Sequence, residues 1–321
     1  MAIIAGIDEA GLGPLLGPLV VSMSVFEIPD DLTDRSFWSL LAGAVIKKVS
    51  KKSPAISITD SKLMRIRSDG IVHLERGVLA MIFQDGTMPQ SLNQLLNCIA
   101  PEAVVQKSHY PWYADADLPL PRQAHPQDLT LRAKSVSNAM KRQGIALKTV
   151  RAEPLLAGHF NKLIKSTNNK AVVLFSLTGR LIDYVFRTYG ADNRTIIIVD
   201  SQGGRVHYLK PLQQIFEGAY IKVVQESPRR SVYLVRDGQR EAEIRFCTNA
   251  EKQSLPVALA SMTSKYIREL FMELLNDWWS KRLANLKPTA GYYVDGQRFI
   301  KEIRLIAKQE NIDKDLLIRC R

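Results

Sequence analysis

An apolar run near the start of this chain ends in two adjacent carboxylates. Residues 2–7 are rich in β-branched side chains and predict a buried strand, which Asp8 and Glu9 follow directly. A turn rich in Gly and Pro comes next, and the apolar run 19–26 predicts a returning strand. Charges at the end of a buried strand need water, a paired charge or a bound metal ion. The opening therefore predicts either a solvated hairpin turn or a carboxylate site at a sheet edge.

A second buried strand also ends on an acid. Residues 195–199 form a continuous β-branched run, which is typical of a central strand buried on both faces, and Asp200 follows it. If the two strands lie side by side, Asp8 and Asp200 share one edge of the sheet, where α/β folds usually keep their sites. The five histidines are dispersed, and carboxylates without His or Cys partners suit Mg²⁺ or Mn²⁺.

Composition narrows the class of protein. The chain has 321 residues, of which 46% are hydrophobic and 24% charged, and its net charge is +12. A basic balance of this size favours an anionic partner, nucleic acid first. No apolar stretch reaches the roughly 20 residues of a membrane-spanning helix, and the start lacks the pattern of a signal peptide. Three scattered cysteines fit a reducing compartment. We therefore expect a cytoplasmic protein without a membrane span.

Strand and helix patterns alternate from residue 144 onward, which predicts an α/β fold. Before that, residues 84–143 are rich in Pro, His and Gln and give weak signals, so they predict an inserted, loop-rich subdomain. Its aromatic side chains can stack on bases, although burial is the favoured use. Strands are expected at 145–150, 195–199, 219–224, 231–235 and 243–247, and helices at 34–49, 65–83, 152–165, 171–189, 255–283 and 297–308.

The most one-sided basic stretch lies between residues 47 and 67. It carries a single acid, Asp60, and can either contact phosphates or form a solubilising face. Its basic residues are Lys47, Lys48, Lys51, Lys52, Lys62, Arg65 and Arg67.

In several motifs the chain resembles the type 2 ribonucleases H (ribonuclease HII). The matching blocks occur in the family's order: Gly-Ile-Asp-Glu-Ala-Gly-Leu-Gly-Pro at the start, Thr-Asp-Ser-Lys at 59–62, the strand that ends on Asp200, the helix block 258–269, and Ala-Gly-Tyr at 290–292. The resemblance implies a ribonuclease H-like mixed sheet flanked by helices. It divides the chain into a core at 1–83 and 144–285, an insertion at 84–143 and a helical C-terminal region at 286–321.

The resemblance also implies a set of site residues. In the family, four acids hold two metal ions that cleave the phosphodiester at a ribonucleotide in a duplex. Here these catalytic and metal-binding residues are Asp8, Glu9, Asp200 and, ten positions before Ser261, Glu251. The implied substrate-binding residues are Gly11, Leu12, Gly13, Ser61, Lys62 and Tyr292.

Two positions depart from the family pattern. The fourth acid is Asp in the family, so Glu251 is one methylene longer and leaves metal preference open. Leu12 stands where the family has an arginine that helps read the step from ribose to deoxyribose. Both departures bear on whether full catalysis and junction specificity are retained.

Three functions remain open at this point. The first is a monomeric, metal-dependent endonuclease that uses Mg²⁺ or Mn²⁺ in a two-metal site. It would hydrolyse the RNA strand of RNA/DNA hybrids or ribonucleotides embedded in duplex DNA. The second is a nucleic-acid-binding protein of the same fold with weak or lost catalysis. The third is a metal-dependent DNA nuclease of related fold, whose insertion carries a new specificity.

Overall fold

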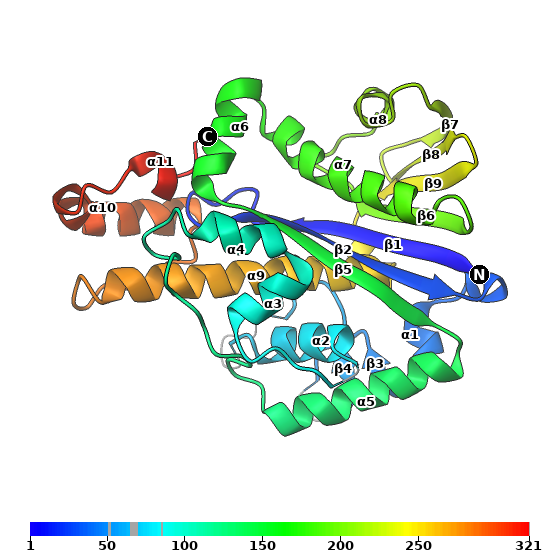
Figure 1. Ribbon diagram of the computed structural model, residues 1–321, viewed down its shortest axis with the longest axis horizontal. Coiled ribbons are helices and arrows are strands. Elements are labelled where there is room, and N and C mark those ends of the chain that lie inside the picture. Colours follow the sequence, from blue (N-terminus) through cyan, green and yellow to red (C-terminus); the bar gives the residue numbers. More distant parts are fainter. Residues whose placement is uncertain (51–52, 65–69, 85, 321) are drawn as a thin grey trace.

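A seven-stranded mixed sheet forms the centre of the protein (Figure 1). The computed structural model describes residues 1–50, 53–64, 70–84 and 86–320. The strand order is β5-β2-β1-β6-β9-β8-β7, in which β1–β6 and β6–β9 are parallel and the other neighbours antiparallel. The strands are β1 (Ala2–Ala10), β2 (Leu19–Ile28), β5 (Ala146–Leu155), β6 (Arg194–Asp200), β7 (Tyr220–Glu226), β8 (Arg230–Asp237) and β9 (Arg240–Cys247).

Helices cover both faces of this sheet, with α9 (Leu255–Ser280) on one and α7 (Lys170–Tyr189) on the other (Figure 1). Side chains alternate along β1, so that Ile4 joins the core under α9 and Ile7 the core under α7. At Gly6, a Cβ would lie 2.2 Å from the backbone of Pro256, so only glycine lets α9 approach β1 this closely. The predicted mixed sheet flanked by helices is confirmed.

The remaining elements lie around this three-layer centre. None of the helices in the described residues has the length and hydropathy that crossing a membrane requires. A small second sheet pairs β3 (Val45–Ile46) with β4 (Ile56–Ser57). The other helices are the 3₁₀ turns η1 (Asp30–Leu32) and η2 (Ala250–Lys252), and α1 (Phe37–Leu40), α2 (Val72–Ile82), α3 (Leu92–Ile99), α4 (Pro101–Lys107), α5 (Pro126–Arg142), α6 (Ala157–Thr167), α8 (Leu209–Ile215), α10 (Tyr293–Gln309) and α11 (Lys314–Leu317).

The segment 84–143 is more helical than its sequence predicted. It contains α3, α4 and α5, while residues 86–91 and the stretches between these helices are irregular. Tyr110, Trp112 and Tyr113 are each 2% exposed and belong to the core under α9, and the ring of Tyr113 meets that of Phe271 edge-on. These aromatic side chains are therefore buried, as favoured, and cannot stack on bases.

A buried carboxylate ties this segment to the rest of the protein. Glu75, on α2, is fully buried and accepts hydrogen bonds from the backbone N–H groups of Arg122, Gln123 and Ala124 at 2.6–2.8 Å. The hydroxyl of Tyr266 on α9 donates a fourth at 2.6 Å. Four donors compensate the cost of burying this charge.

Other predicted elements differ in their bounds. The helix expected at 152–165 begins later, because β5 remains paired with β2 as far as Leu155 and α6 follows. The helix expected at 34–49 is reduced to α1, since the chain turns at Gly43 with a φ of +87°. Of the helix expected at 65–83, α2 forms the second part, and residues 65–69 lie outside the described residues.

Candidate active site

The two strands that end on acids are neighbours. β1 and β6 are parallel, and Ile7 lies opposite Val199, so Asp8 and Asp200 leave the sheet side by side at its carboxyl edge. The side chain of Asp8 is buried, and that of Asp200 is half-buried. The predicted meeting of these two acids at one edge of the sheet is therefore present in the fold.

Glu251 reaches the same edge from a different part of the chain. It belongs to η2, and the backbone N–H of Ala250 donates a hydrogen bond of 2.7 Å to Oδ1 of Asp200. Glu251 is 5% exposed, and within the described part of the chain its Oε2 has no hydrogen-bond partner. Glu9, next to Asp8, interacts electrostatically with both Asp200 and Glu251. The four acids implied by the resemblance are thus brought together.

Their proximity raises the pKa values of the carboxyl groups. Burial raises the pKa of Asp8 well above its usual value, and the charges of Glu9 and Asp200 raise it further. Burial followed by the charge of Asp200 raises the pKa of Glu9 to about 7. For Asp200, burial and the charge of Glu251 raise the pKa to about 6, against the hydrogen bond from Ala250. Like charges held together in this way repel each other unless protons or cations neutralise them.

The donor set fits a hard divalent cation. All four side chains offer carboxylate oxygens, which Mg²⁺ and Mn²⁺ prefer, and the buried Oε2 of Glu251 lacks a partner among the described residues. As they stand, no three or more His, Cys, Asp or Glu side chains of the described residues are already arranged to hold an ion. Oδ1 of Asp8 instead accepts the N–H of Glu9 at 2.7 Å, as Oδ1 of Asp200 accepts that of Ala250.

The Thr-Asp-Ser-Lys turn lies against the acids. Ser61 is buried, and its hydroxyl is 3.0 Å from that of Ser261 on α9, which in turn hydrogen-bonds to Asp8. Asp60 shapes the turn by accepting the backbone N–H of Lys62 at 2.9 Å. The positive charge of the exposed Lys62 lowers the pKa values of Glu9 and Asp200 and so partly offsets the effect of burial. Ser61 therefore supports Asp8, while Lys62 faces the site.

In the glycine loop that follows β1, from Gly11 to Pro18, the first two glycines differ in their surroundings. Gly11 has a φ of +88°, and a Cβ there would lie 2.6 Å from the carbonyl oxygen of Pro18, so the protein itself requires glycine. Gly13 is exposed, and a Cβ there would meet nothing within 4 Å. Leu12, between them, is half-buried and packs against the core under α7.

Two buried arginines hold this loop from below, and the sequence interpretation missed both. Arg268 on α9 donates hydrogen bonds to the carbonyl oxygens of Pro18 (2.9 Å), Leu16 (3.2 Å) and Ala290 (2.9 Å). Arg319 donates to those of Gly11 (2.6 Å) and Leu12. Each arginine is 1% exposed. Arg268 lies inside the helix block of the resemblance, but no local signal marks Arg319.

Tyr292 lies beside the same loop. Residues 290–292 precede α10, and the carbonyl of Gly291 accepts the N–H groups of Leu15 (2.8 Å) and Leu16 (3.3 Å). The ring of Tyr292 is 51% exposed and so accessible to a ligand. Lys265, the lysine of the helix block 258–269, forms an ion pair of 2.7 Å with Glu269 one turn further along α9, which supports a structural role.

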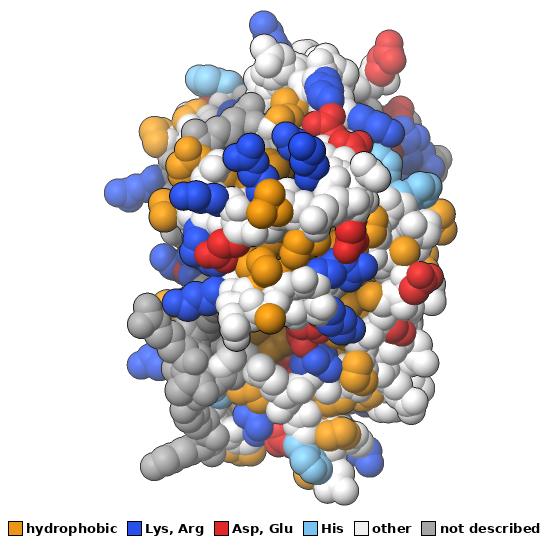
Figure 2. All heavy atoms as spheres, turned by 90° about the vertical axis from the view of Figure 1, so that its left-hand side faces the viewer, with side chains coloured by type: hydrophobic (Ala, Val, Ile, Leu, Met, Phe, Trp, Pro, Cys, Tyr) orange, Lys and Arg blue, Asp and Glu red, His pale blue; other side chains and the backbone are white. Residues whose placement is uncertain are grey.

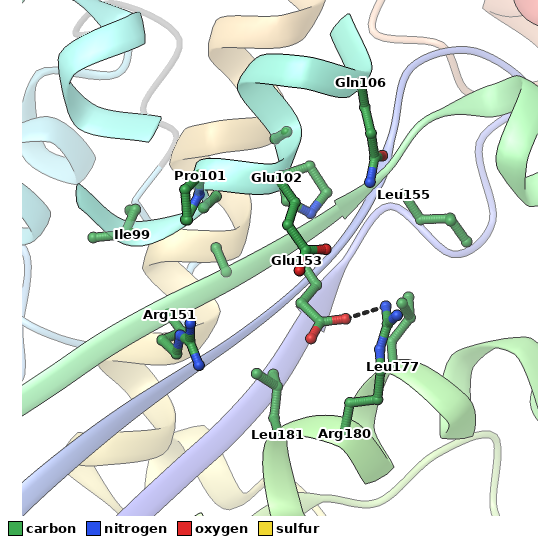
Figure 3. Close-up of a pocket in the computed structure, with 14 residues that line it drawn as sticks. Ile99, Pro101, Glu102, Gln106, Arg151, Glu153, Leu155, Leu177, Arg180 and Leu181 are labelled. Atoms are coloured by element: carbon green, nitrogen blue, oxygen red, sulfur yellow. Dashed lines mark hydrogen bonds and ion pairs between the residues drawn. The ribbon is translucent and has the colours of Figure 1, made fainter. Parts of the chain in front are cut away.

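A separate small pocket opens on the same face of the sheet as Glu9, two strands away on β5 (Figure 3). It holds about 110 Å³ between α4, β5 and α7. Glu153 in its wall is paired with Arg180, and the guanidinium of Arg151 stacks 4.4 Å from the ring of Tyr184. The two acids of this pocket, Glu102 and Glu153, share its lining with two arginines, whereas four acids meet at the sheet edge.

Comparison with known proteins gives structural matches only. No protein-family model and no curated protein matches the chain. Among solved structures, it is similar to RNase HII of Archaeoglobus fulgidus in its complex with PCNA, at 14% identity and a TM-score of 0.43, over 99% of this chain and 94% of that one. It is also similar to ribonuclease H2 of Pyrococcus horikoshii OT3, at 14% identity and a TM-score of 0.43, over 98% and 92%.

A third similar structure is Bst-RNase HIII in complex with Mn²⁺, at 13% identity and a TM-score of 0.45, over 99% of this chain and 66% of that one.

Proposed function

We propose that the protein is a divergent type 2 ribonuclease H. It would be a metal-dependent endonuclease that hydrolyses the RNA strand of RNA/DNA hybrids or ribonucleotides embedded in duplex DNA. The observation that carries the proposal is the cluster of Asp8, Glu9, Asp200 and Glu251 at the carboxyl edge of β1 and β6, where burial and mutual repulsion raise pKa values. A cluster of this kind is costly to the fold and is expected where a cation is bound.

The four carboxylates would hold the metal ions. When bound, a pair of divalent cations activates water and stabilises the leaving oxygen of an in-line displacement. The protein's own part is to keep the acids at one edge. The parallel pairing of β1 and β6 fixes Asp8 beside Asp200, and the hydrogen bond from Ala250 brings Glu251 to them.

Other residues would position the substrate strand. The ammonium of Lys62 lies near Glu9 and Asp200, so it can contact a phosphate next to the reacting one. The open space at Gly13 lets a sugar approach the loop backbone, and the 2′-hydroxyl is the group that distinguishes RNA from DNA there. The exposed ring of Tyr292 can pack against a sugar on the other side of the loop.

One side of the molecule is rich in basic residues, which supports the proposal that the substrate is a polyanion. Lys and Arg side chains are spread over the side that carries the C-terminal helices (Figure 2). Between residues 281 and 308 only Asp295 and Glu302 are acidic. The basic residues of this stretch are Lys281, Arg282, Lys287, Arg298, Lys301, Arg304 and Lys308. Because α10 begins at the glycine loop, this side can follow a duplex that leaves the acids.

The alternative is a nucleic-acid-binding protein with weak or lost catalysis. Two observations favour it. The side chain of Leu12 packs against the core and, unlike an arginine, cannot donate hydrogen bonds to a substrate. Glu251 places its carboxylate on a longer arm than the family's aspartate. The retention of Asp8, Glu9 and Asp200 together opposes it, because a binding protein gains nothing from mutually repelling acids.

Labelled duplexes that contain one ribonucleotide, a run of ribonucleotides or none would separate these functions. We expect metal-dependent cleavage of the ribonucleotide-containing duplexes in Mg²⁺ or Mn²⁺, and none of the all-DNA duplex. Binding without cleavage in either metal would favour the alternative. Equal cleavage of the all-DNA duplex would identify a DNA nuclease and contradict the proposal.

A further inference from the structure

Arg319 is separated from the glycine loop by about 300 positions in sequence, yet it contacts the loop directly. Its Nη1 and Nη2 atoms bond the carbonyl oxygens of Gly11 and Leu12, and its own N–H donates to the carbonyl of Leu15 at 2.9 Å. The side chain is 1% exposed, and the guanidinium lies 4.4 Å from the ring of Phe160 on α6. Arg319 thus forms the floor under the start of the loop.

No acid compensates this buried charge within the described part of the chain, where Arg319 forms no ion pair and its Nε has no hydrogen-bond partner. A buried guanidinium without an acid is costly, and the two loop carbonyls are the groups that stabilise it. A side chain needed only to fill this space would be better stabilised without a charge. The arrangement therefore indicates that the role of Arg319 is to fix the directions of the Gly11 and Leu12 carbonyl groups.

Fixing these carbonyls also fixes two donors. In a trans peptide the C=O of one residue and the N–H of the next point in opposite directions. The carbonyls of Gly11 and Leu12 point down to Arg319, so the N–H groups of Leu12 and Gly13 point away from it. Neither N–H group donates to an acceptor in the described residues. Successive N–H groups on one side of the backbone form a concavity that binds anionic or hydroxyl oxygens.

We propose that Arg319 is a positioning residue, which orients the Leu12 and Gly13 N–H groups toward the substrate strand beside the acids. The role rests on the proposed ribonuclease function. The segment around α11 thus acts as a clasp, by which we mean that it reaches back and holds the glycine loop through Arg319. Figure 1 shows the C-terminal end beside α6 and the loop that follows β1.

The segment is docked independently of the guanidinium, which makes the role testable. Nδ2 of Asn161 on α6 donates to the carbonyls of Asp315 (2.9 Å) and Ile318 (2.7 Å), and its Oδ1 accepts the N–H of Cys320 at 2.7 Å. These bonds do not involve the Arg319 side chain. Arg319→Ala therefore removes the floor of the loop and leaves the segment attached.

The first readout is amide hydrogen exchange of the full chain, which needs no activity. In Arg319→Ala, we expect faster exchange at Leu15 and Leu16, whose N–H groups bond Gly291, and unchanged exchange at Cys320. Arg304→Ala, at an exposed arginine on α10, is the matched control and should change neither. Unchanged exchange at Leu15 and Leu16 in Arg319→Ala would overturn the clasp.

The second readout is cleavage of a duplex with a run of ribonucleotides. We expect Arg319→Ala to lower kcat about 10- to 100-fold, as loss of a supporting group typically does, with KM little changed. Added guanidinium ion, but not ammonium, should restore part of the loss. Faster loop exchange with normal kcat, or a loss without guanidinium rescue, would overturn the positioning role. If the parent cleaves no duplex, the proposed function and this role fall together, while exchange still decides whether the clasp exists.

Discussion

The acidic edge and the glycine loop are neighbours in the chain, but their polar groups are satisfied in opposite ways. At the acidic edge, Asp8, Glu9 and Asp200 repel one another, and the buried Oε2 of Glu251 has no partner among the described residues. In the loop from Gly11 to Pro18, carbonyl oxygens face inward and accept hydrogen bonds from two buried arginines.

This difference distinguishes the region that we expect to bind a ligand from the region that stabilises the fold. Acids without partners lower the stability of the fold, and a bound cation restores this stability. Relief of the repulsion therefore contributes favourably to the binding of the cation. Satisfied carbonyls stabilise the fold and leave the N–H side of the loop free. We therefore expect substitutions at the acids to change activity more than stability, and substitution of Arg268, which braces three loop carbonyls, to lower stability first.

The largest expected effect is the loss of cleavage in Asp8→Asn and Asp200→Asn. Each change removes a charge that would neutralise the metal, so activity should fall by more than the roughly 10- to 100-fold typical of an outer-shell change. Thermal stability in metal-free buffer should hold or rise, because repulsion is relieved. Asp192→Asn, at an exposed acid before β6, is the control. Normal cleavage with a large loss of stability would make these acids structural.

Arg268→Met should show the reverse pattern. It leaves the carbonyls of Leu16, Pro18 and Ala290 without donors, and an unsatisfied buried acceptor costs about 1–3 kcal/mol. We expect a drop of at least this size in the free energy of unfolding, measured with urea. Arg304→Met should change it by less than about 0.5 kcal/mol, as surface changes usually do. Equal stability of the two variants would refute the bracing of the loop.

Glu251→Asp should alter the choice of metal. The longer side chain suits Mn²⁺, which tolerates varied geometry, better than Mg²⁺, which demands a near-ideal octahedron. Cleavage by parent and mutant in each metal should therefore show a selective gain in Mg²⁺ for the mutant. Inactivity of the mutant in both metals would show that Glu251 is not the fourth ligand.

The smallest effect is expected for Lys62→Gln, because this substitution removes a single contact with a phosphate. The slope of log affinity against log salt should flatten by about 0.9 for a duplex of B-form DNA with one ribonucleotide. Lys222→Gln, at an exposed lysine on the edge strand β7, should leave the slope unchanged. Similar slopes for parent and Lys62→Gln would make Lys62 a solvated side chain. Lys51, Lys52, Arg65 and Arg67 lie outside the described residues, so their predicted role in the basic stretch stays a prediction.

Most of the acidic edge could be predicted from the sequence, because a strand period and a terminal charge are local signals. Asp8 and Asp200 follow β-branched runs, and parallel pairing brings them together. Glu251 carries no such signal, since it lies in a short turn after β9 and was found only through the resemblance. The helices α3 and α4 were missed because each is short and Pro101 separates them.

The brace under the loop could not be predicted in the same way. Arg319 binds the loop through side-chain contacts with backbone carbonyls across the whole length of the chain. Any carbonyl can accept such a bond, so no residue type near Gly11 indicates its partner. Contacts of this kind depend on the final packing of α6 and α11 against the loop.

Binding of Mn²⁺ tests the central claim most directly, because it reports on the acids without any substrate. The concentration of free Mn²⁺ can be followed by electron paramagnetic resonance during titration of the parent, Asp8→Asn, Asp200→Asn and Asp192→Asn. We expect saturable binding by the parent and by Asp192→Asn, and binding at least about 10-fold weaker in the two site variants, since a lost ligand should cost no less than a lost supporting group. Superimposable isotherms for all four proteins would contradict a metal centre at this edge of the sheet.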